Sequence, residues 1–300
     1  MVGTSFNALV AVLAVASSIV ASPLPVKRAP TWADRSTATI YPGVNTNTAG
    51  SCTSNFIFYQ GDEIYIGQAA HCASTGESTD TDGCSSGSLP ENSPVTITGA
   101  SQPGILVYSS WLRMQQRGET DANTCAYNDF ALVRIDPADH DKVNPTVSTF
   151  GGPTGLRTSD LSPLEQVYSY GNSVLRQGIT LLSPKLGVNL QEQGDGWSHN
   201  VGTVSPGIPG DSGSGFFDKS GLAFGTLSTL QFAPLPASNG VGDLNKELSY
   251  ARTFGDFAGV QLATGTAPFA VTLPDLSTGL VSTLQNLPGA LASDQGLLGL

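Results

Sequence analysis

Three histidines are available to carry protons in this chain, and one of them has distinctive surroundings. His71 ends a β-prone run, where a strand can deliver its imidazole to the edge of a cleft. His140 and His199 lie in polar segments, where exposed histidines without a special role are expected. The chain has no His-Glu-x-x-His and no Cys-x-x-Cys pattern. We therefore predict no zinc site, no other metal and no cofactor.

A carboxylate and a hydroxyl that can work with His71 follow it along the chain. Asp129 precedes the apolar run 130–133, where a carboxylate needs a hydrogen-bond partner such as an imidazole N–H. Ser212 lies in Gly210-Asp211-Ser212-Gly213, where glycines let the backbone turn sharply and aim N–H groups beside the hydroxyl. Together, in the order His, Asp, Ser, these motifs indicate a catalytic site built on a serine hydroxyl.

The order of these residues excludes two other classes of serine hydrolase. An α/β-hydrolase needs Gly-x-Ser-x-Gly and the order Ser, Asp, His. Here Ser214 stands two residues after Ser212, and no histidine follows His199. A subtilisin-like enzyme needs the order Asp, His, Ser, which this chain does not have.

The residues that must position these groups are divided among many short elements. The 35 glycines and 19 prolines exceed the usual share of roughly 12%, and this excess favours an all-β chain. One helix is predicted late in the chain, with Leu248, Ala251, Phe254 and Phe257 on one face and Asp243 as its N-cap. The β-prone runs between turn residues are 55–59, 63–66, 94–98, 105–108, 130–135, 166–170, 179–182 and 222–227.

Both ends of the chain are predicted to lie outside the folded domain. Residues 1–21 resemble a secretory signal peptide, because their apolar stretch is too short to span a bilayer. Residues 22–28 form a short propeptide ending in Lys27-Arg28, which resembles a kexin-type processing site. The predicted domain covers residues 29–267. Residues 268–300 form a low-complexity tail that fits neither a GPI signal nor a spanning helix.

Charge and hydropathy exclude several classes of partner. The formal net charge is −11, so the basic surface that supplies most affinity for nucleic acid is not expected. No apolar run reaches the length needed to cross a membrane. We predict a secreted, extracellular monomer.

Three short blocks resemble the chymotrypsin (trypsin-like) serine peptidase family, over about residues 40–260. The blocks are 69–72 (Ala-Ala-His-Cys), 129–132 (Asp-Phe-Ala-Leu) and 210–213 (Gly-Asp-Ser-Gly). The resemblance implies two six-stranded antiparallel β-barrels, with a catalytic site between them. It also implies an endopeptidase that acts on protein or peptide substrates. His71 would be the base, Asp129 would orient it, and Ser212 would be the nucleophile.

The resemblance assigns three further residues around the nucleophile. The N–H groups of Gly210 and Ser212 would form the oxyanion hole. Pro206 stands at the base of the substrate pocket, where family members that cleave after Arg or Lys carry Asp. Ser228 would line the substrate channel, and Leu227 before it replaces the His of glutamyl-specific members. An apolar or small side chain is therefore expected before the cleaved bond.

The chain departs from the family pattern at the proposed processing site. The mature chain would begin Ala29-Pro30-Thr31-Trp32, without the Ile-Val-Gly-Gly whose freed N-terminus pairs with the Asp before the nucleophile in digestive members. Asp211 must then find a cation or backbone donors within the domain. This departure places the chain nearer the bacterial and glutamyl-endopeptidase-like branches, whose zymogens mature differently.

Four cysteines in a secreted chain predict two disulfides, and the residues alone leave three pairings open. The resemblance implies Cys52–Cys72, which leaves Cys84–Cys125 as the second bridge. The acidic stretch 77–83 has the composition of a calcium loop, but a solvated acidic turn explains it equally well.

An interpretation from a different class is a catalytically silent, secreted homologue that acts as a binding or effector module. The triad positions and the oxyanion glycine are all present, and this favours the enzyme.

Overall fold

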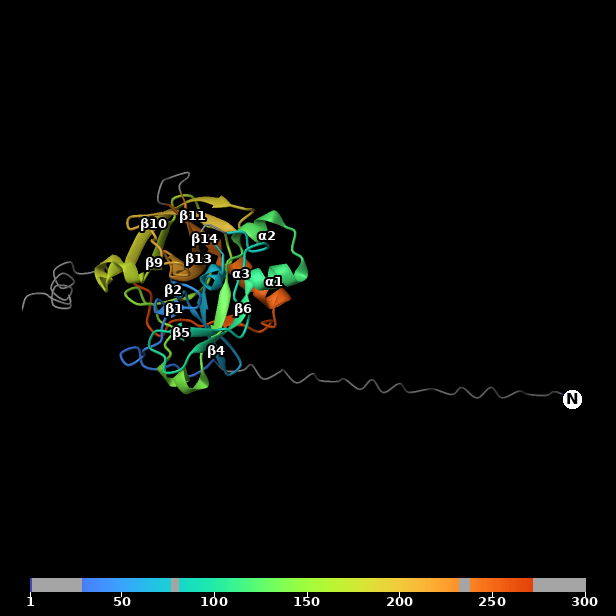
Figure 1. Ribbon diagram of the computed structural model, residues 1–300, viewed down its shortest axis with the longest axis horizontal. Coiled ribbons are helices and arrows are strands. Elements are labelled where there is room, and N and C mark those ends of the chain that lie inside the picture. The colour runs from blue at the N-terminus through green and yellow to red at the C-terminus, as the bar shows by residue number, and fades with distance from the viewer. Residues whose placement is uncertain (2–28, 77–80, 232–237, 272–300) are drawn as a thin grey trace, which may run out of the picture.

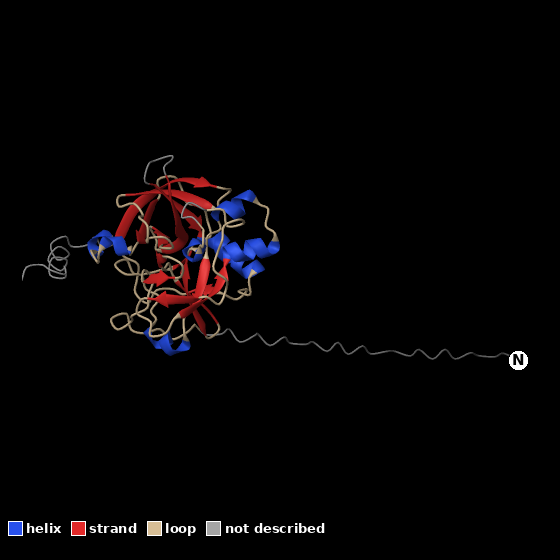
Figure 2. Cartoon of the chain, viewed as in Figure 1, coloured by secondary structure: helices blue, strands red, loops and turns tan. Residues whose placement is uncertain are grey.

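The computed structural model describes residue 1 and residues 29–76, 81–231 and 238–271. The strands within 29–271 form two β-barrels that lie side by side (Figure 1). In this view the strands of the second barrel lie above those of the first, and α1, α2 and α3 gather on one flank. Strands dominate both halves (Figure 2). The predicted signal peptide, the propeptide and most of the tail lie outside the described residues.

The first barrel is made by the N-terminal strands together with β15, in the order β15-β3-β4-β7-β6-β5-β1-β2. Apart from β15, the two ends of this order are β2 and β3, which are parts of one bent segment. The Ser54 N–H donates to the Val44 carbonyl and the Asn55 N–H to the Gly67 carbonyl, so pairing continues across the bend. This continuity closes six antiparallel strands into a barrel, with β15 added to β3 at the rim. The strands are β1 (Asn45–Asn47), β2 (Ser51–Thr53), β3 (Ile57–Gln60), β4 (Glu63–Gln68), β5 (Pro94–Ile97), β6 (Gly104–Ser109), β7 (Ala131–Arg134) and β15 (Gln261–Leu262).

In the second barrel, pairing between separate strands closes the ring without a bent segment shared by two strands. β12 pairs with both β9 and β13, so the order β12-β9-β10-β11-β14-β13 forms a ring of six antiparallel strands. β8 (Gly155–Leu156) adds to β13 in parallel. The prediction of two six-stranded barrels is confirmed. The ring consists of β9 (Gln166–Tyr170), β10 (Pro184–Gln193), β11 (Ser198–Thr203), β12 (Gly215–Asp218), β13 (Leu222–Gln231) and β14 (Ser238–Asp243).

The predicted late helix is confirmed as α3 (Leu244–Phe254), but it ends before Phe257, which was predicted to lie on the same helical face. Phe257 joins the same core cluster from the segment after the helix. The Asp243 side chain caps α3 by accepting a backbone N–H of the first turn at 2.8 Å. The buried Leu248 faces a cluster of aromatic side chains at the junction of the barrels. There Phe56 of the first barrel meets Phe217 of the second edge-to-face, with ring centroids 5.3 Å apart. The helix thus packs on the seam between the barrels.

Two helices between β6 and β7 were not predicted. α1 (Ser110–Arg117) buries Trp111 and Met114, three residues apart, and ends at Gly118 with φ 64°. α2 (Ala122–Tyr127) is a six-residue helix that leads directly toward Asp129. Both are too short for a helical hydrophobic period to emerge from the sequence.

The prediction of a strand at residues 179–182 is wrong. Thr180–Leu182 forms a 3-10 turn, η4, within the connection between β9 and β10. Leu182 remains 45% exposed, so this β-prone run has no core to face. The other 3-10 turns are η1 (Ala70–Ala73), η2 (Pro137–Lys142) and η3 (Val174–Arg176).

Among the described residues, no helix has both the length and the apolar character that crossing a membrane requires.

Candidate active site

His71 and Asp129 are joined by two hydrogen bonds at the seam. β4 delivers His71 to η1, and α2 ends just before Asp129. The imidazole Nδ1 lies 2.6 Å from Asp129 Oδ2, and the His71 backbone N–H donates to Oδ1 at 2.8 Å. The pair fixes the plane of the imidazole and leaves its Nε2 edge for another partner. The His71 side chain is 26% exposed and that of Asp129 is 5% exposed.

A third donor to the Asp129 carboxylate comes from the second barrel. The Ser228 hydroxyl of β13 donates to Asp129 Oδ2 at 2.5 Å. Burial alone would raise the pKa of Asp129, but the His71 charge and the hydrogen bonds from His71 and Ser228 lower it. Burial likewise opposes protonation of His71, yet the neighbouring Asp129 carboxylate raises the pKa of the imidazole. Asp129 therefore stays ionised and can stabilise a positive charge on His71.

Two consecutive tight turns present Ser212. The Asp211 N–H donates to the Ile208 carbonyl, and the Ser214 N–H donates to the Asp211 carbonyl. Gly210 and Gly213 occupy the third position of these turns with φ 95° and 87°, a conformation that favours glycine. An ideal Cβ on Gly210 would lie 2.8 Å from the Ser173 hydroxyl oxygen. Ser212 stands between the two glycines.

Backbone contacts hold this loop against the elements that carry His71 and Asp129. The Thr53 N–H of the first barrel donates to the Ser212 carbonyl at 2.9 Å. The Gly213 N–H donates to the Leu227 carbonyl at 2.7 Å, one residue before Ser228. An ideal Cβ on Gly213 would lie 2.9 Å from the backbone nitrogen of Ala69, two residues before His71. The structure therefore gathers the segments of all three sequence-predicted residues at the seam of the barrels.

The N–H groups of Gly210 and Ser212 are available to a ligand. In the part of the chain that the structure describes, neither donates a hydrogen bond to another residue of that part. Two unengaged N–H groups beside a hydroxyl can stabilise an oxyanion that develops there.

Asp211 has the internal partners that its burial demands. Its fully buried carboxylate lies 2.9 Å from the Lys185 ammonium and forms a second ion pair with Arg176. The backbone N–H groups of Ser173 and Ile208 donate to it at 3.0 and 3.1 Å. Burial would raise the pKa of Asp211, but the two cations lower it. Cations and backbone donors of the domain thus occupy the place that a freed N-terminus would need.

Sequence reasoning did not identify Lys185 or Arg176. The only local signal was a lysine at the start of a run of alternating residues, in what became β10. Lys185 Nζ also donates to the carbonyl oxygens of Ser205 and Pro206, at 3.3 and 3.1 Å. The ammonium thus holds the segment before Ser212, including the predicted base of the substrate pocket at Pro206.

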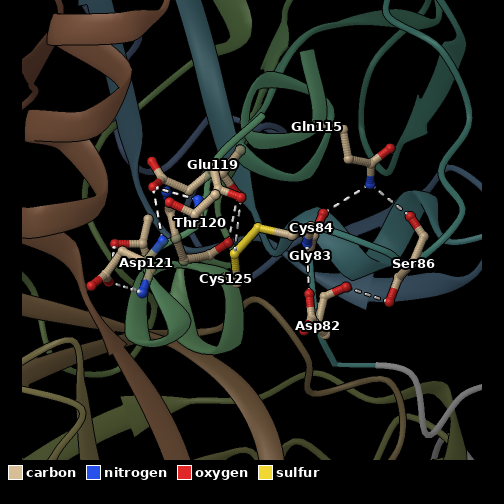
Figure 3. The surroundings of a disulfide bond; sticks show 12 residues. Asp82, Gly83, Cys84, Ser86, Gln115, Glu119, Thr120, Asp121 and Cys125 are labelled. Carbon is tan, nitrogen blue, oxygen red and sulfur yellow. Dashed lines mark hydrogen bonds between the residues drawn. A yellow bond between two sulfur atoms is a disulfide. The ribbon is translucent and has the colours of Figure 1, made fainter. Parts of the chain in front are cut away.

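Both disulfides lie around the His71–Asp129 pair. Cys52–Cys72 joins β2 to η1 directly beside His71. Cys84–Cys125 joins the loop after His71 to α2, and Figure 3 shows the surrounding hydrogen bonds. Gln115 of α1 donates there to the carbonyl oxygens of Gly83 and Ser86, both at 2.8 Å (Figure 3). These sulfurs are bonded to one another and are not metal ligands.

The expectation of exposed surroundings is wrong for His199. Its side chain is 2% exposed, and Nε2 lies 3.1 Å from Asp243 Oδ2 beside the ring of Phe224. The ring of Phe224 on β13 packs edge-to-face against this imidazole, with ring centroids 5.5 Å apart. His140 is partly buried in η2, with Nε2 3.2 Å from the Ile135 carbonyl oxygen. Neither contacts the His71–Asp129 pair.

No protein-family model and no curated protein sequence matches this chain. Among solved structures, protease A of Thermobifida fusca is 19% identical with a TM-score of 0.48, covering 76% of this chain and 100% of its own. A glutamic acid-specific serine protease described as using a histidine triad in substrate binding is 18% identical, with a TM-score of 0.45 and coverage of 75% and 100%. A Glu endopeptidase is 16% identical, with a TM-score of 0.47 and coverage of 74% and 96%. At these values the similarity alone does not identify the function of this chain.

Proposed function

We propose that this chain is a secreted serine endopeptidase of the chymotrypsin-like family, with His71, Asp129 and Ser212 as its catalytic triad. The proposal rests on two observations. His71 and Asp129 are joined by two hydrogen bonds, and backbone hydrogen bonds hold the Ser212 loop against Thr53 of the first barrel and Leu227 of the second. An ionised carboxylate, an imidazole with one free nitrogen and a partly exposed serine are the groups that acyl transfer needs.

In the proposed reaction Ser212 Oγ attacks the scissile carbonyl carbon while His71 Nε2 takes the hydroxyl proton. The imidazolium then delivers that proton to the leaving amine, and water hydrolyses the acyl-enzyme by the same two steps. Asp129 keeps the second proton on Nδ1 and stabilises the imidazolium. The N–H groups of Gly210 and Ser212 stabilise the oxyanion, at about 3 kcal/mol per donor.

The described residues assigned to the proposed substrate pocket, Pro206 and Ser228, carry no carboxylate that could bind a basic side chain. Pro206 stands at the base of this pocket, and Ser228 lines the channel while its hydroxyl holds Asp129. The Asp211 carboxylate is occupied by Lys185 and Arg176. We therefore propose protein or peptide substrates with an apolar or small residue before the cleaved bond.

A fluorophosphonate probe tests the proposed function directly. The folded protein should gain one probe at Ser212, visible by intact mass and peptide mapping, because only an activated serine attacks this reagent at neutral pH. The Ser212→Ala variant is the matched control and should stay unlabelled. A folded wild-type protein that takes no label would instead be a catalytically silent homologue.

The pH dependence of hydrolysis should follow the titration of His71. Asp129 raises the pKa of this imidazole above its usual value of about 6.5, and only the neutral form accepts a proton from Ser212. We expect kcat/KM to rise with pH through an apparent pKa above about 6.5, measured with a neutral peptide substrate. Activity that peaked below pH 5 and declined above it would contradict a histidine base.

Activity should not depend on the new N-terminus after cleavage at Lys27-Arg28. Lys185 and Arg176 already pair with the Asp211 carboxylate. The first residues of the domain are held at a different place, against the segment around Val143. There the Ala33 N–H donates to the Val143 carbonyl at 2.9 Å. A chain that starts at Ala29 and one with a few extra residues before it should cleave peptide with similar kcat/KM. A large loss in the folded, extended chain would show that the N-terminus is the switch.

A further inference from the structure

A buried glutamate that the proposed mechanism does not use lies behind Asp129. Glu247 is in the first turn of α3, and its side chain is 0% exposed. The Thr226 hydroxyl of β13 donates to its Oε2 at 2.9 Å. Its Oε1 is packed against Gly242 of β14, where an ideal Cβ would lie 2.3 Å from that oxygen. The same Cβ would lie 3.4 Å from the carbonyl oxygen of Tyr127.

The surroundings of Glu247 do not favour a negative charge. Within the described residues no lysine or arginine pairs with it, and Oε1 receives no hydrogen bond. The titratable groups that face it are Asp129 before β7, Asp243 at the end of β14, and the Tyr108 phenol on β6. Burial and these two carboxylates raise the pKa of Glu247, and the Thr226 hydroxyl and the backbone N–H of Asp129 only partly offset them. A carboxyl group in this position is stable as the neutral acid.

Glu247 lies where it can connect the two segments that define the position of Asp129. On one side is Thr226, two residues before Ser228, whose hydroxyl holds the Asp129 carboxylate. On the other side is the backbone N–H of Asp129, which faces the Glu247 carboxyl. The Tyr127 carbonyl, two residues before Asp129, lies near the same position on Gly242. A neutral carboxyl group can accept hydrogen bonds on one oxygen and donate from the other. It can therefore serve both segments without a second negative charge beside Asp129.

We propose that Glu247, as an uncharged acid, is a positioning residue that holds Asp129 in line with His71 from behind. This inference rests on the proposed function for its effect on catalysis, but not for the charge state of Glu247. A neutral carboxyl group leaves Asp129 as the single charge facing the imidazole.

The test compares Glu247→Gln, which keeps the polar shape without a proton to lose, with Glu247→Leu, which removes both hydrogen-bonding oxygens. Glu247→Gln should keep kcat within about threefold and leave the acidic limb of the pH profile in place. Glu247→Leu should lower kcat by about 10²-fold with KM little changed, since the catalytic groups lose alignment. Its acidic limb should also move to lower pH as His71 loses its carboxylate partner. Glu192→Gln, at an exposed position on β10, is the matched control and should change none of these values.

Two results would overturn the proposal. If Glu247 were ionised, Glu247→Gln would remove a negative charge and shift the acidic limb to lower pH. If Glu247→Leu folded and kept wild-type kcat and pH profile, no positioning role would remain. Should the Leu variant not fold, Thr226→Val takes its place, because it removes the hydroxyl held by Glu247. Unchanged kcat in Thr226→Val would then count against the proposal in the same way.

Thermal unfolding tests the charge state without any enzymatic activity. The pKa of Glu247 is higher in the folded state than in the unfolded state. The neutral acid therefore contributes its full stabilising free energy below about pH 4.5, the usual pKa of glutamate, and this contribution decreases as the pH rises toward the folded-state pKa. Glu247→Gln cannot lose this proton, so its Tm relative to wild type should increase between pH 5 and pH 8. If the difference in Tm between Glu247→Gln and wild type stayed constant from pH 5 to pH 8, Glu247 would not be uncharged in the folded protein. If fluorophosphonate labelling fails in the wild type, the proposed function fails while this measurement still decides the charge.

Discussion

Replacing Ser212 by alanine should reduce peptide hydrolysis by about 10⁴- to 10⁶-fold in kcat. The hydroxyl is the only group in the proposed mechanism that forms a bond to the substrate, so no neighbour can substitute for it. Residual turnover would come from the oxyanion N–H groups and from substrate binding alone. The measurement is steady-state cleavage of a chromogenic peptide under conditions where contaminating peptidase is excluded.

The variant should fold as the wild type does. Ser212 is partly exposed, and its carbonyl, which accepts the Thr53 N–H, is retained. Its free energy of unfolding should stay within about 0.5 kcal/mol of wild type. Ser220→Ala, on the exposed turn before β13, is the control for a serine-to-alanine change and should keep full activity. Proteolysis near the wild-type rate in Ser212→Ala would remove this serine from the mechanism.

Replacing Asp129 by asparagine should reduce kcat by about 10⁴-fold while the packing is retained. The 2.6 Å contact between Nδ1 and Oδ2 requires an acceptor, and an amide nitrogen at that place would donate instead. The imidazole would then carry its proton on Nε2 and could not accept one from Ser212. Loss of the carboxylate also lowers the pKa of His71, so the remaining activity should have its acidic limb at lower pH.

Asp62→Asn is the control for this exchange, because Asp62 lies on the exposed turn between β3 and β4. It should leave both kcat and the pH profile unchanged. A small effect of Asp129→Asn on kcat, with an unmoved acidic limb, would mean that the contact with His71 has no catalytic consequence.

The sequence identified the three residues of the proposed triad, but it did not identify the residues that support them. Short sequence motifs contain His71, Asp129 and Ser212, and their neighbouring residues are enough to predict a role for each. The glycines at 210 and 213 also predict the turns around Ser212. The sequence predicts that Asp211 needs a cation or backbone donors, because a buried charge must be paired. The partner itself could not be named, since Lys185 reaches it from a strand 26 residues away in the sequence.

The same limit applies to Glu247. Its position one turn into α3 resembles that of any helix-favouring glutamate, and only the pairing of β13 with β14 encloses it behind Asp129. For the fold, the turn-rich composition and the alternating runs predicted the β class and the N-cap predicted α3. α1 and α2 were missed, because tertiary packing of Trp111 and Met114 outweighs weak local signals in so short a segment.

Both disulfides and the His71–Asp129 pair belong to the half of the chain that a ribosome completes first. The Ser228 hydroxyl and the Ser212 loop arrive only with β12 and β13, about eighty residues later. During synthesis, a cross-linked first barrel can therefore form while its carboxylate still lacks one donor and has no nucleophile beside it. The proposed hydrolytic activity therefore requires both barrels to have folded. The proposed triad is complete only when the second barrel docks on the first, so under the proposed function a chain that is still folding cannot cleave its own segments.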